Sequence, residues 1–244
     1  MKAVTHFFVL CIFVCLMFQS CFVSYNTITG NGVLVREKFT ISDYNEILLN
    51  TSAELIYNND TIAPPYLQIY TDENILPHIN LHVKNGKLII ESEDGVNLRA
   101  TKFTIFTNSG NLNTINISGS GKVYLKGEVN AGEMKMNIAG SGFLAADSLY
   151  CERVTLNISG SGSVNLNGVS TYSKFKISGS GKIDALQFSS LEANTHISGS
   201  GNIKLWAGSK LKATISGSGN IQYKGYPEIE DMKVSGSGCI SRIE

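Results

Sequence analysis

The chain has 244 residues, of which 43% are apolar and only 16% are charged, with 20 basic residues balancing 20 acidic ones. This length allows one large domain or two small ones, and the composition excludes a largely disordered chain. The balanced charge leaves no basic surface of the kind that binds nucleic acid, so we expect no nucleic-acid partner.

Residues 1–20 resemble an export signal. An apolar run from Phe7 to Phe18 suits the core of a signal peptide and is too short to cross a bilayer as a helix. Cys21 follows directly after a small residue, as at a bacterial lipoprotein cleavage site. We therefore predict a signal peptide over 1–20, a lipid anchor on Cys21 that attaches the chain to a membrane, and a tether over 21–29. The alternative is an ordinary secretory signal that is cut nearby.

Residues 30–111 form the first part of the predicted domain, which covers 30–244. This part has strand-like alternation without any repeat, and Asn85-Gly86 favours a type I′ hairpin turn. We expect it to be an irregular β cap, since the end coils of a solenoid would otherwise expose unpaired edges. The expected strands are Val33–Phe39, Glu46–Asn50, Glu54–Tyr57, Leu67–Thr71, Ile79–Val83 and Lys87–Glu91.

Residues 112–244 contain seven copies of Gly-Ser-Gly, whose first glycines are 21, 20, 19, 20, 18 and 19 residues apart. A near-constant period of this length indicates a stacked-repeat fold. A sharp corner between strands needs a positive φ or a close approach of backbones, so we assign these glycines to structural turns. They are Gly119, Gly121, Gly140, Gly142, Gly160, Gly162, Gly179, Gly181, Gly199, Gly201, Gly217, Gly219, Gly236 and Gly238.

Apolar and polar residues alternate on both sides of each tripeptide. Phe175 and Ile177 flank Lys176 before one corner, and Ile183 and Ala185 follow it. This period of two predicts two short strands per repeat, each with one buried face, joined by a looser polar return.

Stacking the repeats as coils would bury both apolar stripes and would place Ile177 between Ile158 and Ile197. We therefore predict an all-β chain that folds as a parallel β-helix of about seven coils of 18–21 residues. A meander of hairpins is the alternative, but it needs tight turns at both strand ends, and here only one end repeats strictly. Gly225, in a variable return, is expected to tolerate replacement. Polar residues at 241 and 242 favour a last coil that caps the stack.

No catalytic, metal or cofactor site emerges from the sequence. Ser173 and Lys176 have the Ser-x-x-Lys spacing, but they fall in a predicted strand rather than at a helix start. His78 and His82 are four residues apart without the helix that would align them for zinc. Cys151 and Cys239 lie several repeats apart at different repeat positions, so no disulfide is expected.

A carbohydrate-active enzyme, either a polysaccharide lyase or a glycoside hydrolase on a β-helix, is the alternative reading. Asp147 and Asp184 would lie two coils, or about 10 Å, apart. Paired glycosidase carboxylates sit roughly 5–9.5 Å apart, so this separation is marginal. We expect a protein that is not an enzyme.

The order of motifs along the mature region resembles the bacterial head GIN domain family, whose members are described as putative autotransporter adhesins. The matching segments are Gly30–Val33, Tyr44 and Ile47, Leu81–Ile90, and Leu112–Ile117 leading into the Ser-Gly-Ser-Gly repeats. The resemblance implies a β-helical protein that is secreted or lipid-anchored, with no catalytic residues.

The expected function is therefore an adhesin or an envelope scaffold that binds a glycan or protein ligand. Its expected location is the bacterial cell envelope, lipid-anchored to the outer membrane on the periplasmic side or the surface, or else secreted. Asn116, Asn137 and Asn157 recur at one repeat position and suit a repetitive partner. The alternative is that these amides only bond to one another.

Overall fold

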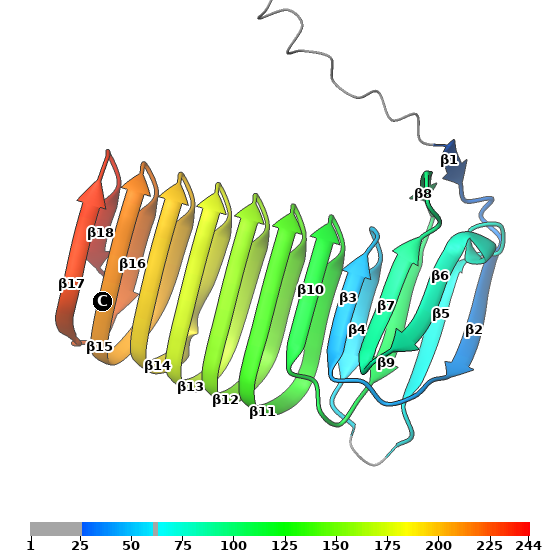
Figure 1. Cartoon of the computed structure of the whole chain (residues 1–244), viewed down its shortest axis with the longest axis horizontal. Helices are drawn as coiled ribbons and strands as arrows, with labels where there is room; N and C mark the ends of the chain where they lie inside the picture. Colours follow the sequence, from blue (N-terminus) through cyan, green and yellow to red (C-terminus); the bar gives the residue numbers. More distant parts are fainter. Residues whose placement is uncertain (1–25, 61–62) are drawn as a thin grey trace, which may run out of the picture.

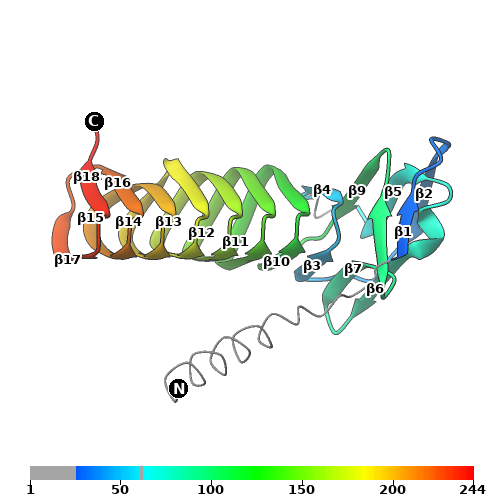
Figure 2. The same ribbon diagram turned by 90° about the horizontal axis from the view of Figure 1, so that it is seen from above.

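The computed structural model describes residues 26–60 and 63–244. They form a stack of parallel coils along the longest axis, with a compact β cap at the N-terminal end (Figures 1 and 2). The stack makes about six turns, so the predicted all-β parallel β-helix is confirmed and the predicted coil count was slightly high. Residues 1–20 and Cys21, with their predicted signal peptide and lipid anchor, lie outside the described residues.

Each long strand of the stack runs from one Gly-Ser-Gly corner to the next and pairs in parallel with the coils on either side. Ile177 is in register with Ile158 on one side and with Ile197 on the other, as predicted. All three are buried, whereas Lys176 is exposed. The strands are β10 (Thr114–Gly119), β11 (Lys122–Gly140), β12 (Phe143–Gly160), β13 (Ser163–Gly179), β14 (Lys182–Gly199), β15 (Asn202–Gly217), β16 (Asn220–Lys224), β17 (Glu228–Ser235) and β18 (Cys239–Arg242).

The return segments differ from the prediction because they are paired strands rather than loose loops. In β12 and β13 the pairing resumes after a register shift, with Leu149 opposite Gly168 and Val154 opposite Ser173. At these shifts the alternation of apolar and polar residues is interrupted, so the sequence pattern does not indicate a strand there. Buried residues on these segments, including Val154, complete the core.

The cap continues the stack beyond β10 and β11, as expected, but its strands do not follow one another in chain order. Strands β3 (Glu46–Asn50) and β4 (Glu54–Asn58) pair in parallel with β10 and β11 on one side and with β7 (Lys87–Ser92) and β9 (Phe103–Asn108) on the other. Antiparallel strands then close the end: β6 (Ile79–Lys84) on β7, β5 (Tyr66–Asp72) on β9, and β2 (Leu34–Thr40) on β5. A small separate sheet joins β1 (Asn26–Thr29) to β8 (Val96–Arg99), and a 3-10 helix spans Leu76–His78.

The predicted hairpin turn at the tip of β6 and β7 is present. Asn85 and Gly86 both have positive φ, 53° and 73°, as a type I′ turn requires. The six strands expected in this region occur within one or two residues of their predicted bounds.

Buried Asp72 anchors the segment that connects β1 to β2. Its carboxylate accepts backbone hydrogen bonds from Gly32 at 2.8 Å and Thr101 at 2.7 Å. Burial alone would raise the pKa of Asp72, but these donors, with Lys102, outweigh burial and lower it. The ionised carboxylate therefore ties two loops of the cap together.

The C-terminal end is not closed in the way the sequence predicted. Arg242 does lie at the end of β18, opposite Tyr223. However, Ile229, Met232 and Val234 on β17 remain 42%, 36% and 44% exposed, although they continue apolar rows that earlier coils bury. Within the described residues no strand covers β17 and β18, so polar residues at 241 and 242 do not make a cap.

Candidate functional site

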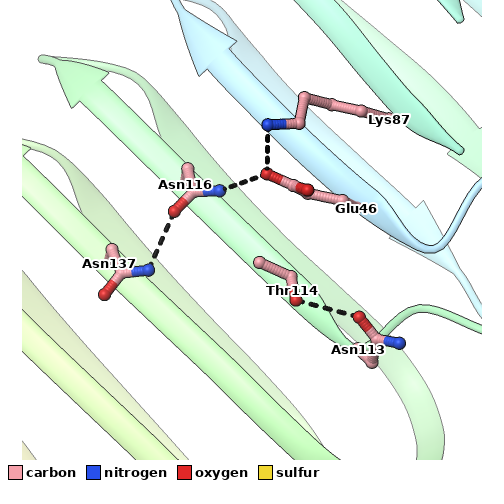
Figure 3. A network of polar contacts seen from close by, with 6 residues as sticks. All are labelled: Glu46, Lys87, Asn113, Thr114, Asn116 and Asn137. Atoms are coloured by element: carbon pink, nitrogen blue, oxygen red, sulfur yellow. Dashed lines mark hydrogen bonds and ion pairs between the residues drawn. The ribbon is translucent and has the colours of Figure 1, made fainter. Parts of the chain in front are cut away.

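A ladder of amide side chains runs along one outer face of the stack (Figure 3). Asn157 Nδ2 donates to Asn137 Oδ1 at 2.9 Å, and Asn137 Nδ2 donates to Asn116 Oδ1 at 2.8 Å. Asn116 Nδ2 then donates to Glu46 Oε1 at 2.7 Å, and Lys87 Nζ lies 2.7 Å from the same oxygen. The parallel register places equivalent side chains one coil apart, which is why the ladder forms.

A shallow groove of about 490 Å³ lies over this ladder. The asparagines line it together with the isoleucines that follow them and the small residues two positions later, Ser118, Ala139 and Ser159. An amide has two N–H donors, and the bonds described here use one on each asparagine. The groove therefore offers amide N–H donors about 4.8 Å apart within a lining whose exposed surface is mostly apolar.

The ladder of amide hydrogen bonds ends at Asn157. The next residues in register are Lys176, His196 and Thr214, so the face becomes cationic and then mixed. At the other end Glu46 and Lys87 extend the ladder into the cap. Sequence reasoning missed both, because Glu46 lies 70 residues from its partner Asn116 and no local signal connects them.

The corner glycines have two different structural roles. In all seven copies the first glycine has a positive φ, for example 122° at Gly179. The last glycine does not, but a Cβ on Gly181 would lie 2.7 Å from Ile158 Cγ2 and 3.0 Å from the Gly162 carbonyl. The expectation that Gly225 tolerates replacement was wrong, since its φ is 100° and a Cβ there would clash with the Ala207 carbonyl of the neighbouring coil.

The side chains considered for catalysis do not converge. Ser173 is buried in strand β13 with no hydrogen-bond partner for its hydroxyl. Asp147 pairs with Lys126 at 3.3 Å, and Asp184 Oδ1 accepts the backbone N–H of Leu186 at 3.3 Å. Both carboxylates are thus engaged in local contacts.

The histidines and cysteines of the described residues do not form a metal site or a disulfide. His78 pairs with Glu93 at 2.6 Å, and no group of three His, Cys, Asp or Glu in the described part of the chain could hold a metal ion. Cys151 and Cys239 are both free thiols. Burial raises the pKa of Cys151 to about 11, so this thiol stays protonated at neutral pH.

Among the described residues, no helix is both long and apolar enough to cross a membrane. The fold and the groove define a capped parallel β-solenoid protein with a repetitive polar face. A family model described as "Putative auto-transporter adhesin, head GIN domain" matches residues 43–227. The chain belongs to this family, as the sequence resemblance predicted.

Solved structures of several bacterial proteins have the same fold. One is a putative lipid binding protein from Parabacteroides distasonis, 32% identical, with a TM-score of 0.78 over 90% of this chain and all of that one. Another is a putative adhesin from Bacteroides fragilis, 26% identical, with a TM-score of 0.82 over 88% of this chain and all of that one. A putative adhesin from Parabacteroides merdae is 27% identical, with a TM-score of 0.72 over 90% of this chain and all of that one. Comparison with curated protein sequences gave no match.

Proposed function

We propose that this protein is a non-catalytic binding protein of the bacterial cell envelope, and that it holds a surface polymer or protein along its solenoid. The groove over Asn116, Asn137 and Asn157 is the observation that supports this most directly. Its donors repeat at the coil spacing, which suits a partner that is itself repetitive, such as a polysaccharide. The adhesin descriptions of the family and of the similar structures agree with this role.

A binding role also agrees with the side-chain chemistry. The amides of the ladder are neutral donors and acceptors already aligned by one another, so they lose little conformational freedom when a ligand arrives. No described carboxylate pair faces the groove, and Asp147 and Asp184 are held by local contacts elsewhere. We therefore favour capture of a polymer over its cleavage.

The location proposed for the protein is the cell envelope, with attachment to the outer membrane through a lipid on Cys21. The lipoprotein-like sequence around Cys21 supports the anchor. Such an anchor would hold the solenoid close to the membrane, because the segment predicted as a tether over 21–29 includes β1 (Asn26–Thr29), which pairs with β8. Either the periplasmic side or the cell surface is compatible with this arrangement.

Binding to glycan and envelope-polymer arrays tests the proposal with the purified full-length chain in detergent. Ala139 is exposed on the groove wall, so Ala139→Trp should fill the groove and reduce binding without touching the core. Glu152→Trp places the same bulk on another exposed side of the stack and should leave binding unchanged.

Two results would overturn the proposal. One is unchanged polymer binding by Ala139→Trp. The other is shortening of the bound glycan on incubation with the wild-type protein, which would show that the chain is a carbohydrate-active enzyme.

A further inference from the structure

A second surface hollow is lined by residues in and beside β15, β16 and β18. These strands lie at the end of the stack opposite the cap (Figure 1). We propose that this hollow binds an acidic oligosaccharide, one whose sugar rings carry carboxylates. This inference rests on the proposed function, since it names a ligand class and a site for the captured polymer. The hollow is called the terminal cleft and is lined by Trp206, Gly208, Lys224, Gly225, Tyr226, Arg242, Ile243 and Glu244.

The terminal cleft has a volume of about 660 Å³ and is built where the last coils bend. Trp206 on β15 is in register with Lys224 on β16, and Arg242 lies at the end of β18. A Cβ on Gly225 would lie 3.2 Å from Trp206 Cδ1 as well as against the Ala207 carbonyl. A side chain at this position would therefore crowd the indole, so the glycine keeps the ring accessible.

Two aromatic rings are unusually open to solvent here. Tyr226 is 83% exposed and Trp206 is 37% exposed. Large aromatic rings are normally buried, and exposed Trp and Tyr mark binding surfaces because they offer wide apolar faces with a polar edge. The C–H face of a pyranose ring is an apolar surface of matching size, so stacking on these rings would hold a sugar.

Each ring is accompanied by a cation. Lys224 Nζ lies 5.5 Å from the centre of the Trp206 ring, and the Arg242 guanidinium carbon lies 4.2 Å from the centre of the Tyr226 ring. Such contacts orient the charge beside the aromatic surface. Neither cation makes an ion pair within the described residues, unlike Lys87 or Lys126.

A sugar carboxylate would satisfy the unpaired charges. A guanidinium binds a carboxylate with two parallel hydrogen bonds, whereas an ammonium attracts it as a point charge. Glu244 also lines the terminal cleft and would repel an anion, so binding depends on direct contact of the sugar carboxylate with Arg242 and Lys224. The Glu244 oxygens can instead accept hydrogen bonds from sugar hydroxyls, which a simple inorganic anion does not have.

The row of side chains leading to the terminal cleft suits a chain of sugars rather than a single one. In successive coils Tyr150, Val169 and Ser189 stand in register before Trp206. Tyr150 and Val169 are 43% and 48% exposed. Three coil steps separate Tyr150 from Trp206, or about 14 Å, which is the length of a short oligosaccharide.

Fluorescence offers a direct test, because Trp206 is the only tryptophan in the chain. The full-length protein in detergent would be titrated with oligogalacturonate hexamer while tryptophan emission is followed. We expect a saturable change that weakens with added salt. Maltohexaose, a neutral hexasaccharide, and hexaglutamate, an acidic peptide, are the comparison ligands and should bind at least about tenfold more weakly.

Substitutions then localise the effect. Arg242→Ala and Tyr226→Ala should each weaken oligogalacturonate binding by about tenfold or more, and Glu244→Gln should tighten it. The matched control is the Arg153–Tyr172 pair, which has a similar 4.6 Å geometry in the middle of the stack. Arg153→Ala and Tyr172→Ala should leave binding unchanged. Urea melts of each variant would establish that it is folded. If Arg242→Ala does not fold, Lys224→Ala removes the other cation of the terminal cleft, which is also exposed.

The outcomes separate this inference from the proposed function. Equal responses to maltohexaose or hexaglutamate would overturn the acidic saccharide as ligand, and no response to any probe would overturn the site. If array binding is lost in Ala139→Trp but persists in Arg242→Ala, the binding role stands and the terminal cleft is excluded. If the wild-type chain binds nothing on the arrays yet responds to oligogalacturonate, the terminal cleft stands and the role assigned to the groove fails.

Discussion

A Cβ built on Gly179 would lie 2.6 Å from the carbonyl oxygen of Gly160 in the neighbouring coil. That carbonyl is fixed, because it accepts the backbone N–H of Ser180 at 2.9 Å. The corner therefore stacks so closely that each first glycine of a Gly-Ser-Gly copy leaves no room for a side chain on the next.

Replacing Gly179 should destabilise the stack well beyond its own corner. Gly179→Val combines a φ of 122° with this backbone contact, so we expect a loss of more than about 1 kcal/mol in the free energy of unfolding. Because coils template one another, hydrogen exchange should quicken in 158–166 and 197–205. Gly132→Val is the control, since a Cβ there meets nothing within 4 Å. Loosening confined to 175–190 would contradict coupling between coils.

A charge in the inner row should be far worse than one on the outer face. Ile177→Asp would place a carboxylate between Ile158 and Ile197, losing about 1.5–3 kcal/mol of apolar burial plus the cost of desolvating the charge. Lys176→Asp, one residue away and exposed, should change stability by no more than about 0.5 kcal/mol. Urea denaturation of both variants measures the difference. Similar losses of unfolding free energy would argue against Ile177 facing the core and Lys176 facing solvent.

The asparagine ladder should contribute stability as well as a surface. Asn137→Ala removes two hydrogen bonds, one donated to Asn116 and one accepted from Asn157, so we expect a loss of about 1–2 kcal/mol. Asn130→Ala is the control, because this exposed side chain donates to Glu128, two residues away, and does not join the ladder. Equal melting midpoints for the two variants would show that the ladder is energetically neutral.

Stability should fall in acid partly through Asp72. Its pKa is lowered in the folded state, so its contribution is complete above the unfolded value of about 3.9 and is lost as the pH falls below that value. Asp72→Asn should cost about 2 kcal/mol at pH 7 and should flatten the decline in stability between pH 5 and pH 2. Asp94→Asn, an exposed change in the same cap, should preserve the wild-type pH profile.

The mature N-terminus should be a lipidated Cys21. Mass spectrometry of the protein purified from bacterial membranes should show diacylated or triacylated cysteine as the first residue. Cys21→Ser should remove the lipid and release the chain from the membrane fraction. An unmodified N-terminus elsewhere would support the ordinary secretory signal instead.

The sequence predicted the repeating part of this fold well because the same physical cue occurs seven times. Alternation around each corner identified Ile177 as inward and Lys176 as outward, and both assignments hold. Strand β9 escaped prediction because five of its six residues are buried, so it shows no alternation. The paired return segments were not predicted because register shifts interrupt the apolar–polar alternation there.

The candidate site was only partly predictable. The asparagine positions follow from the repeat period, but their extension to Glu46 and Lys87 depends on strands that are distant in sequence. The terminal cleft gathers Trp206, Tyr226 and Arg242 from three different segments, and no spacing rule links them. The prediction that Gly225 tolerates replacement failed because the atoms that crowd it belong to the adjacent coil rather than to its own variable loop.

The order of the strands in the cap also constrains the order in which the chain can fold. Strands β3 and β4 are among the first to emerge, yet their neighbours β7, β9, β10 and β11 all follow them in the chain. The coil at 46–58 can pair with β7 and β9 once the chain is complete to residue 108, but its other side stays open until β10 and the start of β11, near residue 126, have been synthesised. Folding cannot proceed coil by coil from the N-terminus, because the coil at 46–58 gains its second neighbouring coil only when about half of the chain has been made.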